Sequence, residues 1–72
     1  MLSKTRLQEI IGKRIRTIRE DKGYSQEELA ERAGVYRTYV GHVEVGKYMP
    51  SAYTLYKFSK ALGVKAVELL PF

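Results

Sequence analysis

The sequence predicts an all-α fold, in which residues 1–72 form one compact domain of five short helices. Three observations carry this prediction. Apolar residues recur three or four positions apart through most of the chain, as they do along one face of a helix. No pair of alternating segments joined by a hairpin turn occurs. Glycines stand where helices would end, and they are Gly23, Gly34, Gly46 and Gly63.

The first helix is expected over residues 3–22 and the second over residues 26–33. A capping side chain for the first helix could come from Ser3 or Thr5. The second helix opens with a serine that is followed three residues later by a glutamate, which is the pattern of a capping box. The apolar stripe of the first helix is Leu7, Ile10, Ile11, Ile15 and Ile18.

The third helix, residues 37–45, is expected despite conflicting local signals. Tyr, Thr and Val are enriched in strands, and Gly41 costs about 1 kcal/mol relative to alanine inside a helix. A helical period nevertheless places most of the apolar residues of the segment on one side, whereas the alternation of a strand mixes apolar and polar residues on both faces. One side holds Tyr36, Tyr39, Val40 and Val43, and the other holds Arg37, Thr38, Gly41, His42 and Val45.

The fourth helix is expected over residues 52–62, and a short fifth helix over residues 65–70, ending at Pro71. The apolar positions of all these segments define a candidate core. The buried side of the second helix is expected to be Leu29, Ala30 and Ala33. The predicted core is Ile11, Ile15, Ile18, Leu29, Ala30, Val40, Val43, Leu55, Phe58 and Leu62. Tyr24, Tyr53 and Tyr56 are expected to pack with their hydroxyl groups in water.

Composition restricts the function classes. The net charge is +5 and residues 1–22 hold seven Lys and Arg against three Asp and Glu, which favours an anionic partner, nucleic acid before a membrane surface. A solvated charged face is the alternative. The chain has no cysteine, no signal peptide is evident, and no apolar run approaches ~20 residues. We therefore expect a soluble, cytoplasmic protein that does not bind membranes.

Residues 12–64 resemble the phage-repressor and Cro-like, XRE-type, helix-turn-helix family. The resemblance rests on the segment Gln26 to Gly34, the turn Gly34-Val35-Tyr36, the spacing of Glu44 and Gly46, Pro50-Ser51, and Ala61-Leu62-Gly63-Val64. The tetrapeptide RTYV, residues 37–40, also resembles controller proteins of restriction–modification systems. The resemblance implies a lambda-repressor-like, five-helix DNA-binding domain. Its helix-turn-helix would span about 26–45, with the third helix in the major groove of double-stranded DNA.

The resemblance also implies which residues read bases. On the outer face of the third helix the candidates are Arg37, Thr38 and His42, with Tyr36 at the helix start. Arginine pairs bidentately with guanine, threonine offers a hydroxyl and a methyl group, and histidine donates or accepts. Gly41 would let the helix backbone approach the groove. A solvated histidine without a base contact is the alternative for His42.

Phosphate contacts are implied for Gln26, Lys47, Tyr48 and Lys13. Gln26 lies in the first turn of the second helix, where the helix N-terminus also favours an anion. Lys47 and Tyr48 follow Gly46 in a loop whose family counterpart runs along the DNA backbone. For each of these residues the alternative is an ordinary surface side chain.

A partly buried ion pair between Arg19 and Glu44 is implied as well. We expect it to orient the third helix rather than to add net stability, because desolvation offsets much of the attraction. The sequence departs from the family at Tyr36, where serine or threonine commonly caps the third helix. Because tyrosine cannot cap in that way, the first turn is expected to be held less firmly.

The C-terminal residues predict a homodimer. Val67, Leu69, Leu70 and Phe72 are too apolar for a free tail, and an exposed apolar cluster usually marks an interface. A two-fold dimer would recognise a palindrome whose half-sites lie about one DNA turn, ~34 Å, apart. The alternative is that Leu70 and Phe72 fold back onto the core of their own chain.

The sequence as a whole indicates a transcriptional regulator that binds a palindromic operator as a homodimer. The alternative is a protein-interaction module, an antitoxin or adaptor, with weak or no DNA binding. An enzyme is not expected, because the chain has one histidine, no cysteine, no nucleophile motif and no glycine loop for phosphate. No cofactor, metal or small-molecule substrate is expected either. The sequence leaves open whether the protein activates or represses.

Overall fold

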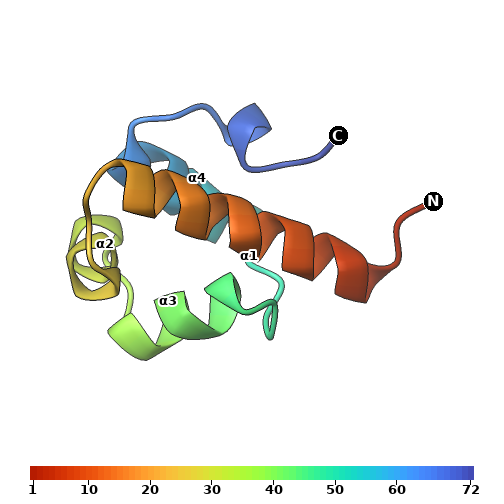
Figure 1. The fold of residues 1–72 in the computed structure, drawn as a ribbon, viewed down its shortest axis with the longest axis horizontal. Helices are drawn as coiled ribbons and strands as arrows, with labels where there is room; N and C mark the ends of the chain where they lie inside the picture. The colour runs from red at the N-terminus through yellow and green to blue at the C-terminus, as the bar shows by residue number, and fades with distance from the viewer.

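A computed structural model describes residues 1–72 and confirms an all-α fold without strands (Figure 1). It contains four α-helices and a final 3-10 turn, so the prediction of a fifth α-helix over residues 65–70 is wrong. In that segment the backbone N–H of Lys65 donates to a Glu68 carboxylate oxygen at 3.0 Å, and Leu69 then enters the core. The helical turn therefore stops at Glu68, where the chain bends inward. The elements are α1 Lys4–Asp21, α2 Gln26–Ala33, α3 Arg37–Glu44, α4 Ala52–Leu62 and η1 Ala66–Glu68.

The long helix α1 crosses the molecule, and the shorter elements pack around it (Figure 1). Helix α2 lies at the C-terminal end of α1, α3 runs beneath it, and η1 lies on the opposite side from α3. The most extensive packing joins α2 to α3, α1 to α3 and α2 to α4. No helix has the length and apolar character needed to cross a membrane.

The helix ends follow the sequence signals closely. The hydroxyl of Ser3 accepts the N–H of Arg6 at 3.1 Å, which identifies Ser3 as the cap of α1. Ser25 and Glu28 form the expected capping box of α2, and the hydrogen bond from the Ser25 backbone lowers the pKa of Glu28. Tyr36 makes no side-chain cap of α3.

The core agrees with most of the predicted set. Ile18 and Leu55 are only partly buried, because they lie at its margin, whereas Ala33 and Leu69 are fully part of it. Tyr24 packs partly buried against the core, as expected, whereas Tyr53 and Tyr56 are exposed and stack on each other at 6.3 Å instead of on the core. The buried apolar residues are Ile11, Ile15, Leu29, Ala30, Ala33, Val40, Val43, Phe58, Leu62 and Leu69.

A glycine within α1 sets the distance between α1 and α3. Gly12 is buried, and a methyl group at this position would overlap the carbonyl oxygen of Val43 and lie 2.7 Å from that of Glu44. Only a residue without a side chain permits such an approach of two helix backbones. Gly12 therefore fixes how closely α3 can be held.

Candidate nucleic-acid interface

The outward side of α3 and the residue before it form a surface that we call the α3 surface: Tyr36, Arg37, Thr38 and His42. Arg37 and Thr38 are exposed and His42 is half-buried. Tyr36 is 85% exposed. It precedes the helix, as expected, in an extended conformation with φ −75° and ψ 147°.

A three-residue connection places α3 across α2. Gly34 ends α2 with φ +71°, in the left-handed region that favours glycine. The N–H of Val35 returns to the carbonyl of Ala30 at 3.0 Å, and α3 begins two residues later. This arrangement is a helix-turn-helix with α3 as its second helix.

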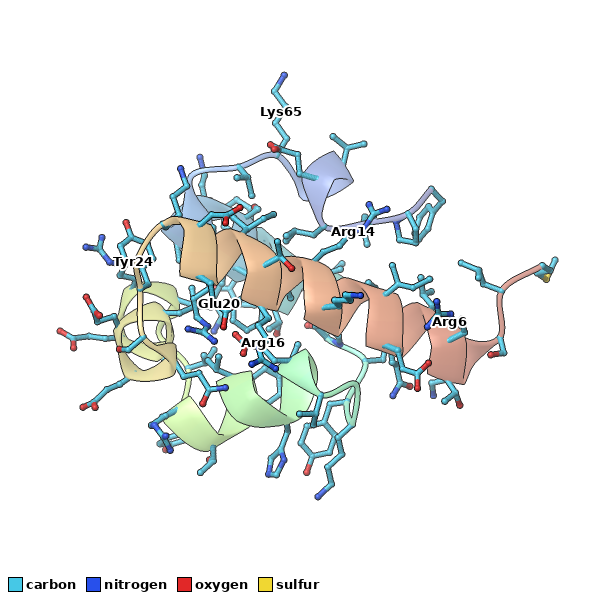
Figure 2. All side chains as sticks on the ribbon, viewed as in Figure 1. Arg6, Arg14, Arg16, Glu20, Tyr24 and Lys65 are labelled. Atoms are coloured by element: carbon cyan, nitrogen blue, oxygen red, sulfur yellow. The ribbon has the colours of Figure 1, made fainter.

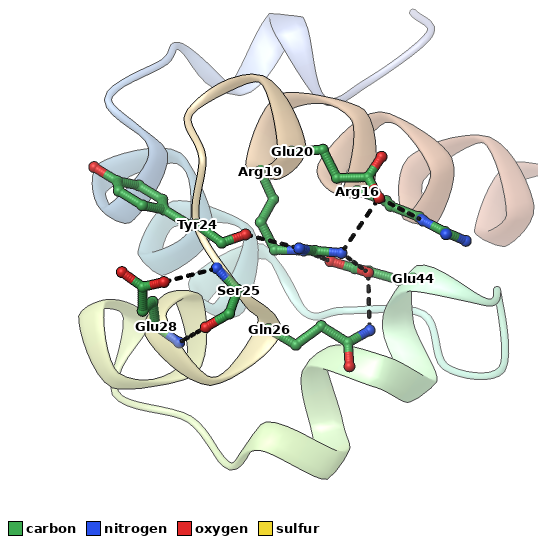
Figure 3. Close-up of polar contacts among 8 residues, drawn as sticks. All are labelled: Arg16, Arg19, Glu20, Tyr24, Ser25, Gln26, Glu28 and Glu44. Atoms are coloured by element: carbon green, nitrogen blue, oxygen red, sulfur yellow. Dashed lines mark hydrogen bonds and ion pairs between the residues drawn. The ribbon is translucent and has the colours of Figure 1, made fainter.

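A buried ion pair joins α1 to the C-terminal end of α3 (Figure 3). The Nε of Arg19 donates to Glu44 Oε2 at 2.7 Å, and Nη2 donates to Oε1 at 3.1 Å. The third donor, Nη1, reaches the carbonyl of Tyr24 at 2.8 Å. The hydrogen bonding that Arg19 donates to the Glu44 carboxylate is the main reason that the pKa of Arg19 is raised, against the opposing effect of burial. The expected pair is thus present, bidentate and nearly excluded from water.

Gln26 extends this network to α2. Its Nε2 donates to Glu44 Oε1 at 3.0 Å, and because an amide nitrogen carries two hydrogens, one remains for another acceptor. The start of α2 already has carboxylates in its first turn, Glu27 and Glu28. These complement the helix dipole, so the case for a phosphate at Gln26 rests on the free amide hydrogen and not on the helix terminus.

Residues 45–51, the α3–α4 loop, begin with a fixed turn. Gly46 has φ +81°, its N–H reaches the carbonyl of Val43 at 3.0 Å, and the N–H of Lys47 reaches that of His42 at 2.9 Å. This is a Schellman motif. The carbonyl of Gly46 in turn accepts a hydrogen bond from Gln8 Nε2 of α1 at 2.9 Å.

A row of aromatic rings ties the loop to the core. Phe58, which is buried, lies parallel to Tyr39 at 6.4 Å, and Tyr39 stacks on Tyr48 at 6.0 Å. The rings of Tyr48 and His42 meet in a T-shaped contact, with 5.3 Å between their centres. Tyr48 and His42, proposed for different contacts, are therefore neighbours, and Lys47 lies 5.8 Å above the Tyr48 ring.

Lys13 does not join this group. It lines a shallow concave surface between α1 and η1, with Arg14, Thr17 and Glu68. Figure 2 shows Arg14 rising from α1 toward the C-terminal segment, while Arg16 and Glu20 lie between α1 and α3. The structure thus brings Gln26, Lys47 and Tyr48 near the α3 surface. Lys13 lies elsewhere, on the side of α1 that faces η1.

The C-terminal segment divides between core and surface. Leu69 is fully buried in its own chain, so its assignment to a dimer interface is wrong: the chain turns inward there to close the core. Leu70 is partly buried, and its carbonyl accepts Arg14 Nη1 at 2.9 Å. Val67 and Phe72 remain 62% and 78% exposed.

Sequence analysis missed two residues that position the site. Gly12 lies beside the apolar stripe of a predicted helix, where it looks like a local cost, although a glycine inside a helix can also mark a close backbone approach. Gln8 carried no signal, because its partner is 38 positions away. No group of His, Asp and Glu side chains is placed to hold a metal ion.

Comparison with known proteins identifies relatives that share the helix-turn-helix described above. A family model described as Helix-turn-helix matches residues 15–69. The chain is 36% identical over 64 residues to an uncharacterized HTH-type transcriptional regulator, y4dJ, of Sinorhizobium fredii, covering 89% of this chain and 83% of that protein. It is 44% identical over 62 residues to the HTH-type transcriptional regulator SinR of Bacillus subtilis, covering 85% of this chain and 56% of SinR.

Solved structures show the same likeness. The restriction-modification controller protein C.AhdI from Aeromonas hydrophila aligns with a TM-score of 0.86 at 40% identity, over 88% of this chain and 96% of that one. A structure of SinR, the master regulator for biofilm formation, in complex with DNA aligns with a TM-score of 0.79 at 43% identity, over 82% of this chain and 95% of that one.

Proposed function

We propose, because this chain belongs to the helix-turn-helix family, that it is a sequence-specific regulator of transcription that binds double-stranded DNA. The observation that carries the proposal is the α3 surface. It presents Arg37 and Thr38 to solvent, on a helix whose other side is fixed to α1 by the Arg19–Glu44 ion pair. The solved complex of SinR with DNA, at 43% identity, supports the same use of the fold here.

Within this proposal the residues divide into two kinds. Arg37, Thr38 and His42 contact base edges, which carry sequence information. Gln26, Lys47 and Tyr48 contact phosphates, which hold the protein in register on any duplex. Lys13 adds a weaker, long-range attraction from α1, because it lies outside the α3 surface.

The separation of base contacts from phosphate contacts makes a measurable prediction. Arg37→Ala should cost about 1–3 kcal/mol on the preferred duplex and much less on a scrambled one, relaxing the choice at one base pair. Lys47→Ala should weaken both duplexes similarly and lower the salt slope by about one unit, because one fewer phosphate counterion is released. Affinities on both duplexes over a salt series, after selection of the preferred site from a random pool, measure these effects.

Matched controls are available on the same chain. Arg32→Ala removes an exposed arginine that stacks on Tyr24 at 4.3 Å, and Lys65→Ala removes a lysine that points away from α3 (Figure 2). Both should leave the affinity within about twofold.

Equal losses for Arg37→Ala on the two duplexes, with a lower salt slope, would make Arg37 a phosphate contact and leave base readout to Thr38 and His42. No duplex binding at low salt would favour a protein-interaction module.

We further propose that the protein acts as a homodimer on a palindromic operator. Val67 and Phe72 are the exposed part of the C-terminal apolar cluster, with Leu70 at its edge, and they supply the contact between two copies. Half-sites would then lie about one DNA turn, ~34 Å, apart.

Sedimentation at micromolar concentration tests the dimer. The unaltered chain should sediment as a dimer, and Val67→Ser combined with Phe72→Ser should give a monomer, because the exposed apolar area that drives association is removed. Tyr53→Ser, which removes an equally exposed ring on α4, should leave the dimer intact. A monomer for the unaltered chain, with and without DNA, would exclude this interface.

A further inference from the structure

We propose that Gln8, on α1, is a positioning residue for the contact between the α3–α4 loop and the DNA backbone, and that it acts through the carbonyl of Gly46. Gln8 does not itself contact DNA in this proposal. The inference rests on the proposed function, since it concerns how the phosphate contact of Lys47 is held in place.

The contact between Gln8 and the loop is direct and partly buried. Gln8 Nε2 donates to the carbonyl oxygen of Gly46 at 2.9 Å, across 38 residues of chain. The loop also packs on the α1 backbone, because a methyl group at Gly46 would lie 3.1 Å from both Cα and Cγ of Glu9. Glycine is thus needed at position 46 for its positive φ and for this packing.

Gln8 fixes one side of a single peptide unit whose other side is also fixed. The carbonyl of Gly46 accepts from Gln8, and the N–H of the same peptide bond, which belongs to Lys47, donates to the carbonyl of His42 at 2.9 Å. A peptide unit is planar, so bonds at both its polar atoms set its tilt. That tilt determines the direction in which the backbone of Lys47 leaves α3.

This arrangement couples α1 to the phosphate contact rather than to base readout. Removing the Gln8 donor frees the carbonyl side of the peptide unit, while the Arg19–Glu44 pair still holds α3 against α1. The orientation of Arg37 should therefore be preserved, and that of Lys47 should not. A merely structural role for Gln8 predicts something different: a change in stability with no change in the salt dependence of binding.

The test is a double-mutant cycle between Gln8 and Lys47. Gln8→Met keeps the side-chain length and removes the donor, and it should weaken the preferred and the scrambled duplex alike, by about three- to tenfold, with a salt slope lowered toward that of Lys47→Ala. Gln8→Met combined with Lys47→Ala should bind no more weakly than Lys47→Ala alone, because the two changes remove one contact. Gln8→Met combined with Arg37→Ala should show the product of the two single losses.

Controls separate the possible failures. Thr17→Met introduces the same side chain on an exposed part of α1 away from the loop and should leave binding unchanged. Thermal unfolding confirms that each variant is folded, and Gln8→Ala replaces Gln8→Met if the latter is not. An unchanged salt slope, or independent losses at Gln8 and Lys47, would overturn this inference while the proposed function stands. Absence of DNA binding by the unaltered chain would overturn both.

Discussion

Gly12→Ala is expected to lower the free energy of unfolding by about 3 kcal/mol, at the upper end of the usual cost of overpacking. The added methyl group would overlap the carbonyl oxygen of Val43 and lie 2.7 Å from that of Glu44. Both are backbone atoms that cannot rotate away, so α3 must shift from α1. For a domain of this size the melting temperature should fall by roughly 12–24 °C, which thermal unfolding followed by circular dichroism measures.

The matched control is the other glycine inside a helix. A methyl group at Gly41 would lie 3.7 Å from Oε1 of Gln26, which is an ordinary contact. Gly41→Ala should therefore stabilise the free protein, by up to about 1 kcal/mol, through helix propensity alone. If the two substitutions change the melting temperature equally, the close approach at Gly12 does not limit the packing of α1 on α3.

Breaking the buried ion pair is the second change with a large expected effect. Glu44→Ala should cost up to about 3–5 kcal/mol, because Arg19 would remain buried with only the half-exposed carboxylate of Glu20, 3.9 Å away, as an ionic partner. Only 2% of the Glu44 side chain and 10% of the Arg19 side chain are exposed to solvent. Since the pKa of Arg19 is raised, the arginine is charged at neutral pH, and the stability that its own shift contributes is lost as the pH rises above its usual pKa. Urea unfolding at neutral pH measures the loss.

Two further variants separate the stabilising role of the ion pair from its role in orienting α3. Arg16→Ala removes an exposed ion pair in which the Arg16 and Glu20 side chains are 59% and 53% exposed, and it should cost less than about 1 kcal/mol. Replacing both partners, Arg19→Met with Glu44→Leu, should restore most of the stability, because no buried charge is left. Affinity for the preferred duplex should not recover, since Gln26 has lost its acceptor. A small cost for Glu44→Ala, similar to that of Arg16→Ala, would contradict a buried pair.

Local features of the sequence were sufficient to predict the helices. The four glycines with positive φ stand at the helix ends, and their spacing, with the capping box at Ser25, placed α1 to α4 within two residues at each end. Such signals depend on neighbours three or four positions away, which the sequence displays directly. The prediction for residues 65–70 was wrong for the opposite reason. Leu69 is buried by contacts with distant helices, and nothing nearby in the sequence distinguishes it from Val67.

The candidate site shows the same division. Arg37 and Thr38 are exposed where the helical period placed them, and the resemblance to a family supplied the Arg19–Glu44 pair. The bond from Gln26 to Glu44 and that from Gln8 to Gly46 could not be inferred. Both depend on how α1, α2 and α3 cross, and the crossing is set by the missing side chain of Gly12.

The aromatic row from Phe58 to His42 has a consequence for the entropy of complex formation. Immobilising a flexible side chain on binding costs roughly 0.5–1.5 kcal/mol. Tyr48 stacks on Tyr39, which lies parallel to the buried Phe58, so its ring has less freedom to lose than an unpacked tyrosine. In the proposed DNA complex the ordering cost should then fall mainly on the exposed side chain of Arg37, and less on Lys47, which already lies 5.8 Å above the Tyr48 ring.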